Sequence, residues 1–255
     1  IQVIRAETFY GGNMASWSKY GGAVYIGNDS ALSSHETQFN NCEFNNCSAS
    51  TDGGGIYCEA SFVADKVTSN VQFYNCTAYR CHADDCGGFI FNYGNNSKFN
   101  GAAYLDSASL AERSAIIGCY ALDSGGAFYS TVESSRGSDV VFKNFNVISC
   151  TAGASSHNFD TIKKNNYNSW GGAVCVRGYN AKVQRCDFYD NYANYYGGAV
   201  YSGWSGSSIE NCSFYANRCQ DGYGNDVYLD ADSGIDVKNC MFLSGGKYSA
   251  GKAAK

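Results

Sequence analysis

The sequence contains no proline, and it also lacks long runs of any one chemical kind. No stretch approaches the roughly 18 consecutive apolar residues that a transmembrane helix needs, so we expect no membrane span. No run of five or more Lys or Arg residues occurs and the net charge is −5, which argues against a nucleic-acid surface. There is no C-x-x-C pair, and the only histidines are His35, His82 and His157. A zinc site of the usual kind is therefore not expected.

Glycine, tyrosine and cysteine are abundant instead, with 30, 21 and 13 residues, and apolar residues at 44% supply enough material for a core. Thirteen cysteines fit an oxidising compartment better than the cytosol. The chain begins at Ile1 without an apolar signal segment, which indicates a processed mature chain or an excerpt. We therefore expect a secreted or cell-surface protein. Five Asn-x-Ser/Thr sequons predict N-glycosylation at Asn28, Asn46, Asn75, Asn95 and Asn211.

Two short motifs alternate along the chain. The first is a Gly-Gly pair followed by β-prone residues, at Gly21–Tyr25, Gly54–Tyr57, Gly87–Ile90, Gly125–Tyr129, Gly171–Val174 and Gly197–Tyr201, with a degenerate copy at Gly224–Tyr228. The second reads F-x-x-N/C or a close variant, at Phe44–Cys47, Phe73–Cys76, Ile116–Cys119, Val147–Cys150, Phe188–Asn191, Phe214–Asn217 and Phe242–Gly245, after a worn copy at Phe9–Gly12. A repeat of this length is typical of a solenoid.

The spacing and composition of the repeat favour a parallel β-helix. Gly171 and Gly197 are 26 residues apart, which is too short for a propeller blade of roughly 40 residues and suits one coil with two or three short strands. Frequent glycines would be costly in helices. We therefore predict an all-β, single-domain parallel β-helix of about eight coils over residues 1–246, with loop insertions in the longer repeats. Residues 247–255 are expected to form a short basic C-terminal tail.

In a β-helix each position of the repeat stacks on its counterpart, so equivalent residues form columns. The first residue of the F-x-x-N/C motif is apolar throughout and is predicted to line the interior, through Phe44, Phe73, Ile116, Val147, Phe188, Phe214 and Phe242. The Gly-Gly pair is predicted to mark a corner that needs positive φ or a close approach between coils. A phosphate-binding loop would need a following helix, and here β-prone residues follow.

Cysteine occupies two columns. One holds Cys47, Cys76, Cys119 and Cys150, followed by Asn191 and Asn217; the other holds Cys42, Cys186, Cys212 and Cys240. We interpret these as structural ladders, in which the thiols either are small buried side chains or bridge neighbouring coils. Metal binding is the alternative, for which the pairs Cys42/Cys47 and Cys81/Cys86 are the nearest match. We predict no catalytic, cofactor-binding or metal-binding residue.

Together, the G-G-A-[IVL] and F-x-x-N motifs are similar to the signature repeats of the polymorphic outer membrane proteins, the chlamydial autotransporter adhesins, from Phe9 to Gly245. The resemblance implies a right-handed β-helix that is secreted or displayed on a surface, for adhesion or as a structural element. Cys replaces Asn in four motifs, and no C-terminal membrane segment follows. We therefore do not expect the autotransporter route here.

Three classes of function are compatible with these features. The first is a non-enzymatic adhesin or structural module that binds protein or glycan ligands or polymerises end to end, and the many tyrosines favour it. The second is a carbohydrate-active enzyme, which would need clustered carboxylates. Those able to cluster are Asp226, Asp230, Asp232 and Asp236, together with Asp84 and Asp85. The third, ice binding, needs a column of Thr residues, and none occurs.

Overall fold

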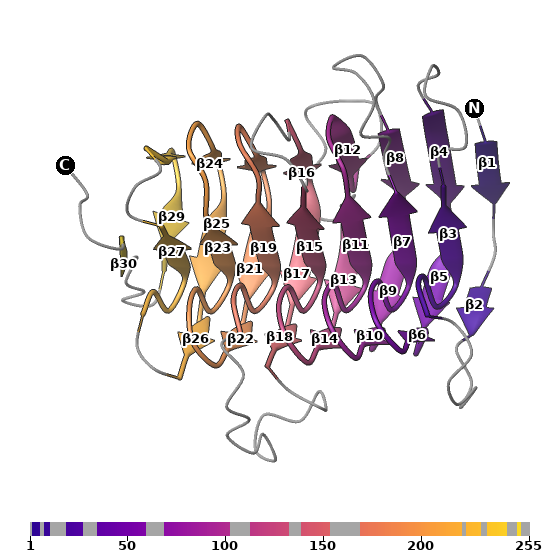
Figure 1. Ribbon diagram of the computed structural model, residues 1–255, viewed down its shortest axis with the longest axis horizontal. Coiled ribbons are helices and arrows are strands. Elements are labelled where there is room, and N and C mark those ends of the chain that lie inside the picture. The colour runs from indigo at the N-terminus through magenta and orange to yellow at the C-terminus, as the bar shows by residue number, and fades with distance from the viewer. Residues whose placement is uncertain are drawn as a thin grey trace.

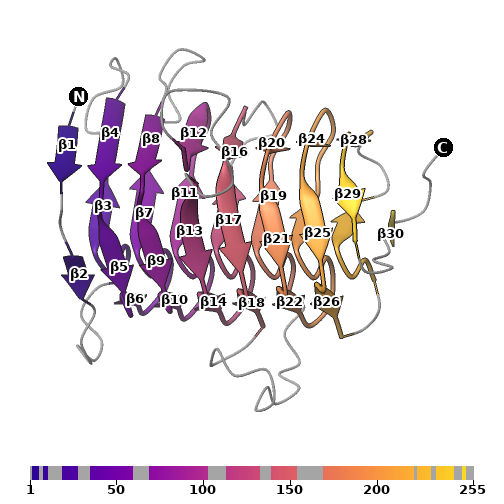
Figure 2. The same cartoon turned by 180° about the vertical axis from the view of Figure 1, so that it is seen from behind.

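The chain winds into a rod of stacked coils whose strands run side by side in four parallel sheets (Figures 1 and 2). In this computed structural model the described residues are 2–5, 8–10, 19–27, 35–59, 69–102, 113–132, 139–153, 169–220, 223–230, 234–243 and 249–250. A complete coil contributes one strand to each sheet in turn, and each strand pairs in parallel with its counterparts in the neighbouring coils. The predicted all-β parallel β-helix of about eight coils is confirmed.

The sheets are numbered in the order in which a coil visits them. Sheet 1 contains β1 (Gln2–Arg5), β4 (His35–Asn40), β8 (Ser69–Tyr74), β12 (Ser97–Asn100), β16 (Val141–Lys143), β20 (Lys182–Gln184), β24 (Ser208–Glu210) and β28 (Asp236–Lys238). Sheet 2 contains β2 (Thr8–Tyr10), β5 (Glu43–Asn45), β9 (Thr77–Tyr79), β13 (Ser114–Ile117), β17 (Phe145–Ile148), β21 (Asp187–Tyr189), β25 (Ser213–Tyr215) and β29 (Met241–Phe242).

The other two sheets complete each coil. Sheet 3 contains the two-residue strands β6 (Ser48–Ala49), β10 (His82–Ala83), β14 (Tyr120–Ala121), β18 (Thr151–Ala152), β22 (Tyr192–Ala193) and β26 (Arg218–Cys219). Sheet 4 contains β3 (Val24–Ile26), β7 (Ile56–Glu59), β11 (Ile90–Tyr93), β15 (Phe128–Thr131), β19 (Val174–Arg177), β23 (Val200–Ser202), β27 (Val227–Leu229) and β30 (Ser249–Ala250).

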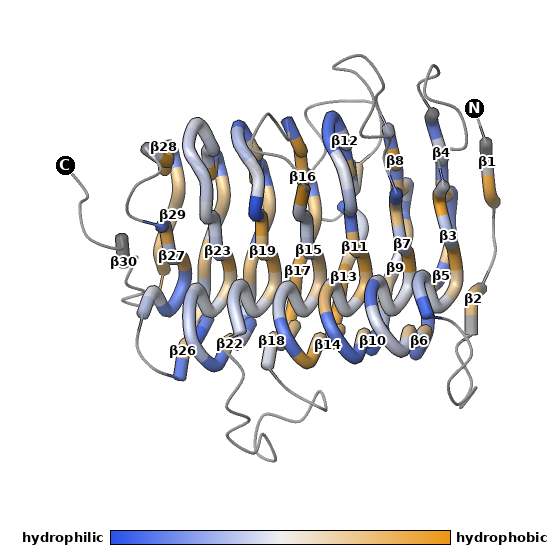
Figure 3. Tube along the Cα trace, in the orientation of Figure 1, coloured by the Kyte–Doolittle hydropathy of each residue, from blue (hydrophilic) through white to orange (hydrophobic). Residues whose placement is uncertain are grey.

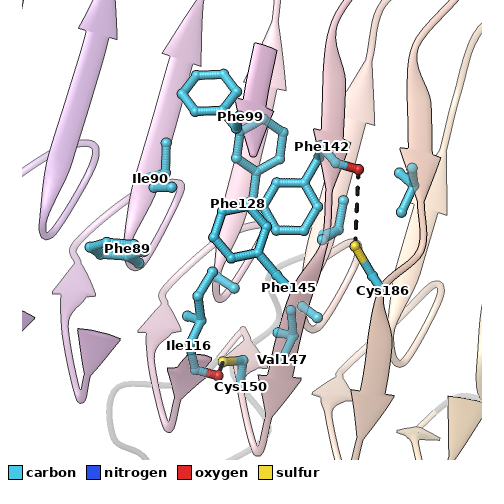
Figure 4. Packing of buried hydrophobic residues seen from close by; sticks show 14 of the residues in the cluster. Phe89, Ile90, Phe99, Ile116, Phe128, Phe142, Phe145, Val147, Cys150 and Cys186 are labelled. Carbon is cyan, nitrogen blue, oxygen red and sulfur yellow. Dashed lines mark hydrogen bonds between the residues drawn. The ribbon is translucent and has the colours of Figure 1, made fainter. Parts of the chain in front are cut away.

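Apolar side chains from sheets 1, 2 and 4 fill the interior. The orange, hydrophobic segments recur at corresponding places in neighbouring coils (Figure 3). The predicted interior column is confirmed in sheet 2, where Phe44, Ile116, Val147, Phe188 and Phe214 are fully buried. The rings of Phe188 and Phe214 stack with their centroids 5.1 Å apart, close to the strand spacing. Figure 4 shows how Phe99, Phe128, Phe142 and Phe145 fill the middle of this interior.

One member of the predicted column is wrong. Phe73 pairs with Phe39 in sheet 1, and the sheet 2 position next to Phe44 is held by Ala78. The reason is that the motif occurs at two corners of one coil. The segment Phe39–Cys47 contains both copies and reads F-N-N-C-E-F-N-N-C. The motif Phe73–Cys76 belongs to the first of these corners, between sheets 1 and 2.

The Cys columns change accordingly. The corner between sheets 1 and 2 carries Cys42, Cys76, Cys186, Cys212 and Cys240, with Ser114 and Phe145 between them. The corner between sheets 2 and 3 carries Cys47, Cys81, Cys119 and Cys150, then Asn191 and Asn217. Cys76, which was predicted to stack with Cys47, therefore belongs to the column of Cys42, and Cys81 takes its place beside Cys47. All thirteen cysteines occur as thiols rather than in disulfides.

Cys, Asn and Ser are interchangeable in these corners because each side chain bonds to the backbone of the preceding coil. Asn191 donates from Nδ2 to the Val147 carbonyl at 3.0 Å, and its Oδ1 accepts from the Cys150 N–H at 2.9 Å. Cys150 donates its thiol to the Ile116 carbonyl at 3.6 Å in the same way (Figure 4). Ser114 donates to the Phe73 carbonyl and accepts from the Cys76 N–H. Where the slot holds Cys, Asn or Ser, a small side chain thus bonds one coil to the backbone of the preceding one, and Phe145 is an exception that fills its slot with an apolar ring.

The Gly-Gly pairs form the corner that leads into sheet 4, and their two members have different roles. Gly87 has a φ of +69°, a conformation that strains residues with a Cβ. A Cβ on Gly88 would overlap the carbonyl oxygen of Gly126 in the next coil. Both predicted reasons for glycine are therefore confirmed. In the second coil the pair in register is Gly53–Gly54, one residue before the predicted Gly54–Gly55, because three glycines occur in succession.

Replacing Asn191 tests the role of the corner side chain. Asn191→Ala leaves the buried Cys150 N–H without its side-chain acceptor, removes one hydrogen bond from the Val147 carbonyl, and is expected to cost about 1–3 kcal/mol. Asn191→Cys should recover about half of this loss, because Cys performs the same role in neighbouring coils. Urea unfolding midpoints of the three proteins measure the difference. Equal destabilisation by both substitutions would show that the side chain acts through volume alone.

Candidate functional site

An acidic cluster lies at the corner between sheets 3 and 4 in three consecutive coils. Asp52, Asp85 and Asp123 each occur one or two residues before a glycine with positive φ, where short polar side chains favour a turn. The stacking of the coils brings them together, since the Asp123 N–H donates to the Asp85 carbonyl at 2.9 Å. We call these three aspartates together with Cys86 the acidic site.

Hydrogen bonds fix the side chains of this site. Asp52 Oδ1 accepts from the Cys86 N–H at 3.1 Å, and the Cys86 thiol donates to Asp85 Oδ1 at 3.5 Å. Ser124 donates its hydroxyl to Asp123 Oδ1 at 3.0 Å. Cys86 is buried, Asp52 and Asp123 are half-buried, and Asp85 is exposed. The carboxylate oxygens and thiol of Asp52, Asp85 and Cys86 all lie within 4.8 Å of one another.

This arrangement makes Asp52 a carboxyl group that titrates near neutrality. Burial, followed by the charges of Asp85 and Asp123, raises the pKa of Asp52 to about 7, although the Cys86 N–H and Lys19 oppose the shift. Burial and Asp85 also raise the pKa of Asp123. Burial and the surrounding carboxylates raise the pKa of the Cys86 thiol well above its usual range, so it is a donor rather than a nucleophile.

The acidic site has two chemical capacities. Because its pKa is about 7, Asp52 can donate or accept a proton near neutral pH, with a second carboxyl group, that of Asp85, beside it. Two carboxylates and one thiol are also ligand atoms for a divalent cation, provided that Cys86 loses its proton. Among the described residues no other group of three His, Cys, Asp or Glu side chains converges in this way.

The carboxylates predicted from the sequence do not form such a group. Asp226 is buried and accepts from Asn217 Nδ2 at 2.9 Å, Asp230 accepts from the Tyr201 hydroxyl, and Asp236 pairs with Lys238. Each therefore has a separate local partner, and Asp232 lies outside the described residues. Of the predicted set, Asp85 alone joins a cluster of this kind, and its neighbour Asp84 is exposed beside it.

Asp52 and Asp123 were not predicted. Their signal is present in the sequence, since an Asp lies one or two residues before the first glycine of three consecutive pairs, at Asp52-Gly53, Asp85-Cys86-Gly87 and Asp123-Ser124-Gly125. Neither alternative metal pair comes together. Cys42 and Cys47 lie at opposite ends of β5, at different corners of one coil, and Cys81 lies inside the coil whereas Cys86 lies under the acidic site. His82 stacks on Tyr120, and His157 lies outside the described residues.

Aromatic side chains form a ladder on the outer face of sheet 4. Tyr57, Phe91 and Tyr129 stack on successive coils with centroids 5.0 and 5.3 Å apart and nearly parallel planes. Cys175 interrupts the ladder, and Trp170 fills the gap by stacking on Tyr201. Because the ring faces cover one another, the middle of this ladder has no open face on which a sugar could stack.

An apolar row lies on the outer face of sheet 2, where polar residues would ordinarily face solvent. It consists of six residues on consecutive coils, Tyr79, Ile117, Ile148, Tyr189, Tyr215 and Leu243. Exposure is greatest toward its C-terminal end, where Tyr189 is 48%, Tyr215 43% and Leu243 54% exposed. The rings of Tyr189 and Tyr215 stack 5.1 Å apart.

The glycosylation sequons remain predictions. Asn46, Asn75 and Asn211 are exposed corner residues with positive φ, and Asn95 is half-buried. Asn28 lies outside the described residues.

Comparison with known protein families, curated proteins and solved structures finds no match for this chain. In the described part of the chain, no helix has the length and hydropathy that crossing a membrane requires.

The raised pKa of Asp52 predicts a pH-dependent stability. Protonated Asp52 contributes fully to stability below its pKa in the unfolded chain, which is about 4. This contribution is lost as the pH rises through its pKa of about 7 in the folded chain, because the folded state holds the proton more tightly. Solvent screening of this half-buried group reduces the loss to about 1 kcal/mol. Asp52→Asn keeps the acceptor for Cys86 and should lose less stability between pH 4.5 and 7.5 than the wild type. Urea unfolding at both pH values measures this, and identical pH profiles would contradict it.

Proposed function

We propose that this protein is a non-enzymatic, secreted or surface-displayed β-helix that acts as an adhesive or structural module and associates with further copies of itself. The observation that carries the proposal is the apolar row on sheet 2. A monomer that never bound a partner would leave this row facing water along six coils. The exposed apolar surface of Tyr189, Tyr215 and Leu243 would then gain no free energy from burial.

A second copy of the chain fits this face because of its spacing. Side chains of the row repeat at the strand spacing of about 4.8 Å, and a second copy of this β-helix repeats its side chains at the same interval over the same number of coils. Two such rows related by a two-fold axis can interdigitate like the facing sheets of a steric zipper.

The charges beside the row do not oppose such a contact. Arg218 pairs with Asp190 at 3.1 Å, and Arg113 pairs with Asp187, so both signs are balanced within one copy. At the N-terminal end of the row the Arg80 guanidinium lies over the Tyr79 ring. Like faces of two copies can therefore approach without repulsion between unpaired charges.

The surface location rests on other support. The resemblance of the repeats to surface adhesins favours it, as do the exposed sequons at Asn46, Asn75 and Asn211. The number of cysteines no longer favours an oxidising compartment, because the corner thiols act as hydrogen-bond donors to the preceding coil.

Removing the two exposed tyrosines tests self-association. Tyr189→Ser combined with Tyr215→Ser should raise the dissociation constant at least tenfold, which sedimentation velocity over a concentration series measures. Tyr192→Ser, on sheet 3, is the matched control and should leave association unchanged. A wild type that stays monomeric at every concentration would overturn the proposal. Association that survives the double substitution would instead support end-to-end stacking.

The acidic site favours a second candidate, a carbohydrate-active enzyme. Glycosidases that retain anomeric configuration use two carboxyl groups about 5 Å apart, one of them protonated at neutral pH. Two features support this candidate: an oxygen of Asp52 lies within 4.8 Å of an oxygen of Asp85, and the pKa of Asp52 is raised to about 7. Asp52 would be the general acid and Asp85 the nucleophile.

Release of reducing sugars from a panel of neutral and acidic polysaccharides tests this candidate. If it holds, Asp52→Asn and Asp85→Asn should each lower the rate at least a hundredfold, while Asp230→Asn, which removes a carboxylate outside the site, keeps it. Absence of any release by the wild type, or full activity of both variants, would leave the non-enzymatic proposal standing.

A further inference from the structure

The corner between sheets 2 and 3 contains a row of thiols inside the coil. Four consecutive coils place a cysteine at the same position, with the residues that follow them paired in register. All four side chains are buried, with exposed fractions of 1% or less. We call this row the thiol ladder; its members are Cys47, Cys81, Cys119 and Cys150.

Neighbouring thiols of the ladder lie in register on adjacent coils. The thiols of Cys47, Cys81 and Cys150 each donate to a carbonyl of the preceding coil, those of Phe9, Phe44 and Ile116. The ladder therefore contains three sulfur-to-sulfur gaps, each between adjacent coils.

The spacing of these gaps does not suit disulfides. In-register parallel strands hold equivalent side chains one strand spacing apart, about 4.8 Å. A disulfide needs its two Cβ atoms within about 3.5–4.5 Å and its sulfurs at about 2.05 Å. Closing a gap would therefore pull two coils out of register, which agrees with the thiols in the structure.

The same spacing suits a soft metal ion held between two sulfurs. Thiolate ligands select soft ions such as Cu(I). With the zinc–sulfur length of about 2.3 Å as a guide to a metal–sulfur bond, a linear arrangement places the two sulfurs about 4.6 Å apart. A tetrahedral zinc site would need four sulfurs around one point, whereas a row offers each ion only two. The geometry thus distinguishes two-coordinate monovalent ions from zinc.

We propose that the thiol ladder binds Cu(I) or Ag(I), one ion in each of its three gaps. Each ion replaces one thiol proton, so three ions displace three protons, the fourth thiol keeps its own, and the row stays neutral. Because the sulfurs are buried, we expect loading during folding rather than by diffusion into the finished coil. Serine already occupies the equivalent slot of the neighbouring corner at Ser114, which indicates that Ser variants will fold.

Ag(I) is the probe, added as silver nitrate while the full chain refolds without thiol reductants. Native mass spectrometry counts the bound ions, and circular dichroism checks the fold. Cys81→Ser combined with Cys119→Ser leaves no adjacent thiols in the ladder and should bind three fewer ions than the wild type. Cys58→Ser combined with Cys175→Ser removes two thiols outside the Cys columns and should bind the same number as the wild type.

The outcomes separate a ladder from simple thiol titration. Equal losses in the two double variants, or a folded wild type that binds no silver, would overturn the proposal. If the ladder variant fails to fold, Cys150→Ser at the end of the row serves instead and should bind one ion fewer. Retention of the wild-type number by that variant would also contradict the proposal.

Discussion

Register between neighbouring coils is the constraint on which the rest of this structure depends. Each strand pairs with its counterpart residue for residue, and this continues through the corners because corner side chains bond to backbone groups of the preceding coil. Asn191 and Ser114 show the requirement in its complete form, with one donor and one acceptor used in each. Positive φ at Asn46, Asn75 and similar residues turns the chain immediately before the slot. The corner chemistry therefore joins local conformation to stacking.

The same constraint explains what could be predicted from the sequence. A corner that turns by positive φ and then takes a small side chain in most coils leaves a repeated motif, so the coils, the Gly-Gly corner and all but one of the described members of the interior column were predictable. What could not be assigned was which of two similar corners a motif belonged to. Phe73–Cys76 and Phe44–Cys47 read alike, yet the pairing places them in different sheets. Only the register between coils distinguishes them, and single motifs do not encode it.

The acidic site was missed for a related reason. Asp52 lies beside Gly53, whereas Asp85 and Asp123 are two residues from their glycines, so they occupy neighbouring columns rather than one. In the true register Asp52 stacks on Cys86 rather than on Asp85, so the carboxylates meet across two columns. The predicted cluster at Asp226, Asp230 and Asp236 relied on closeness along the chain instead. In a solenoid closeness along the chain is a poor guide, because residues a whole coil apart are nearer than residues at opposite corners of one coil.

Strict stacking also gives this fold a tendency that is independent of any particular function. Any residue type repeated at one position becomes a row with a spacing of about 4.8 Å, whatever its chemistry. Apolar residues in such a row form a strip on sheet 2, and carboxylates on successive coils raise one another's pKa values at Asp52 and Asp123. Thiols in a row gain partners at a distance too long for a disulfide. A β-helix therefore converts small biases in its repeat into extended linear sites, and its functions are to be sought in rows rather than in pockets.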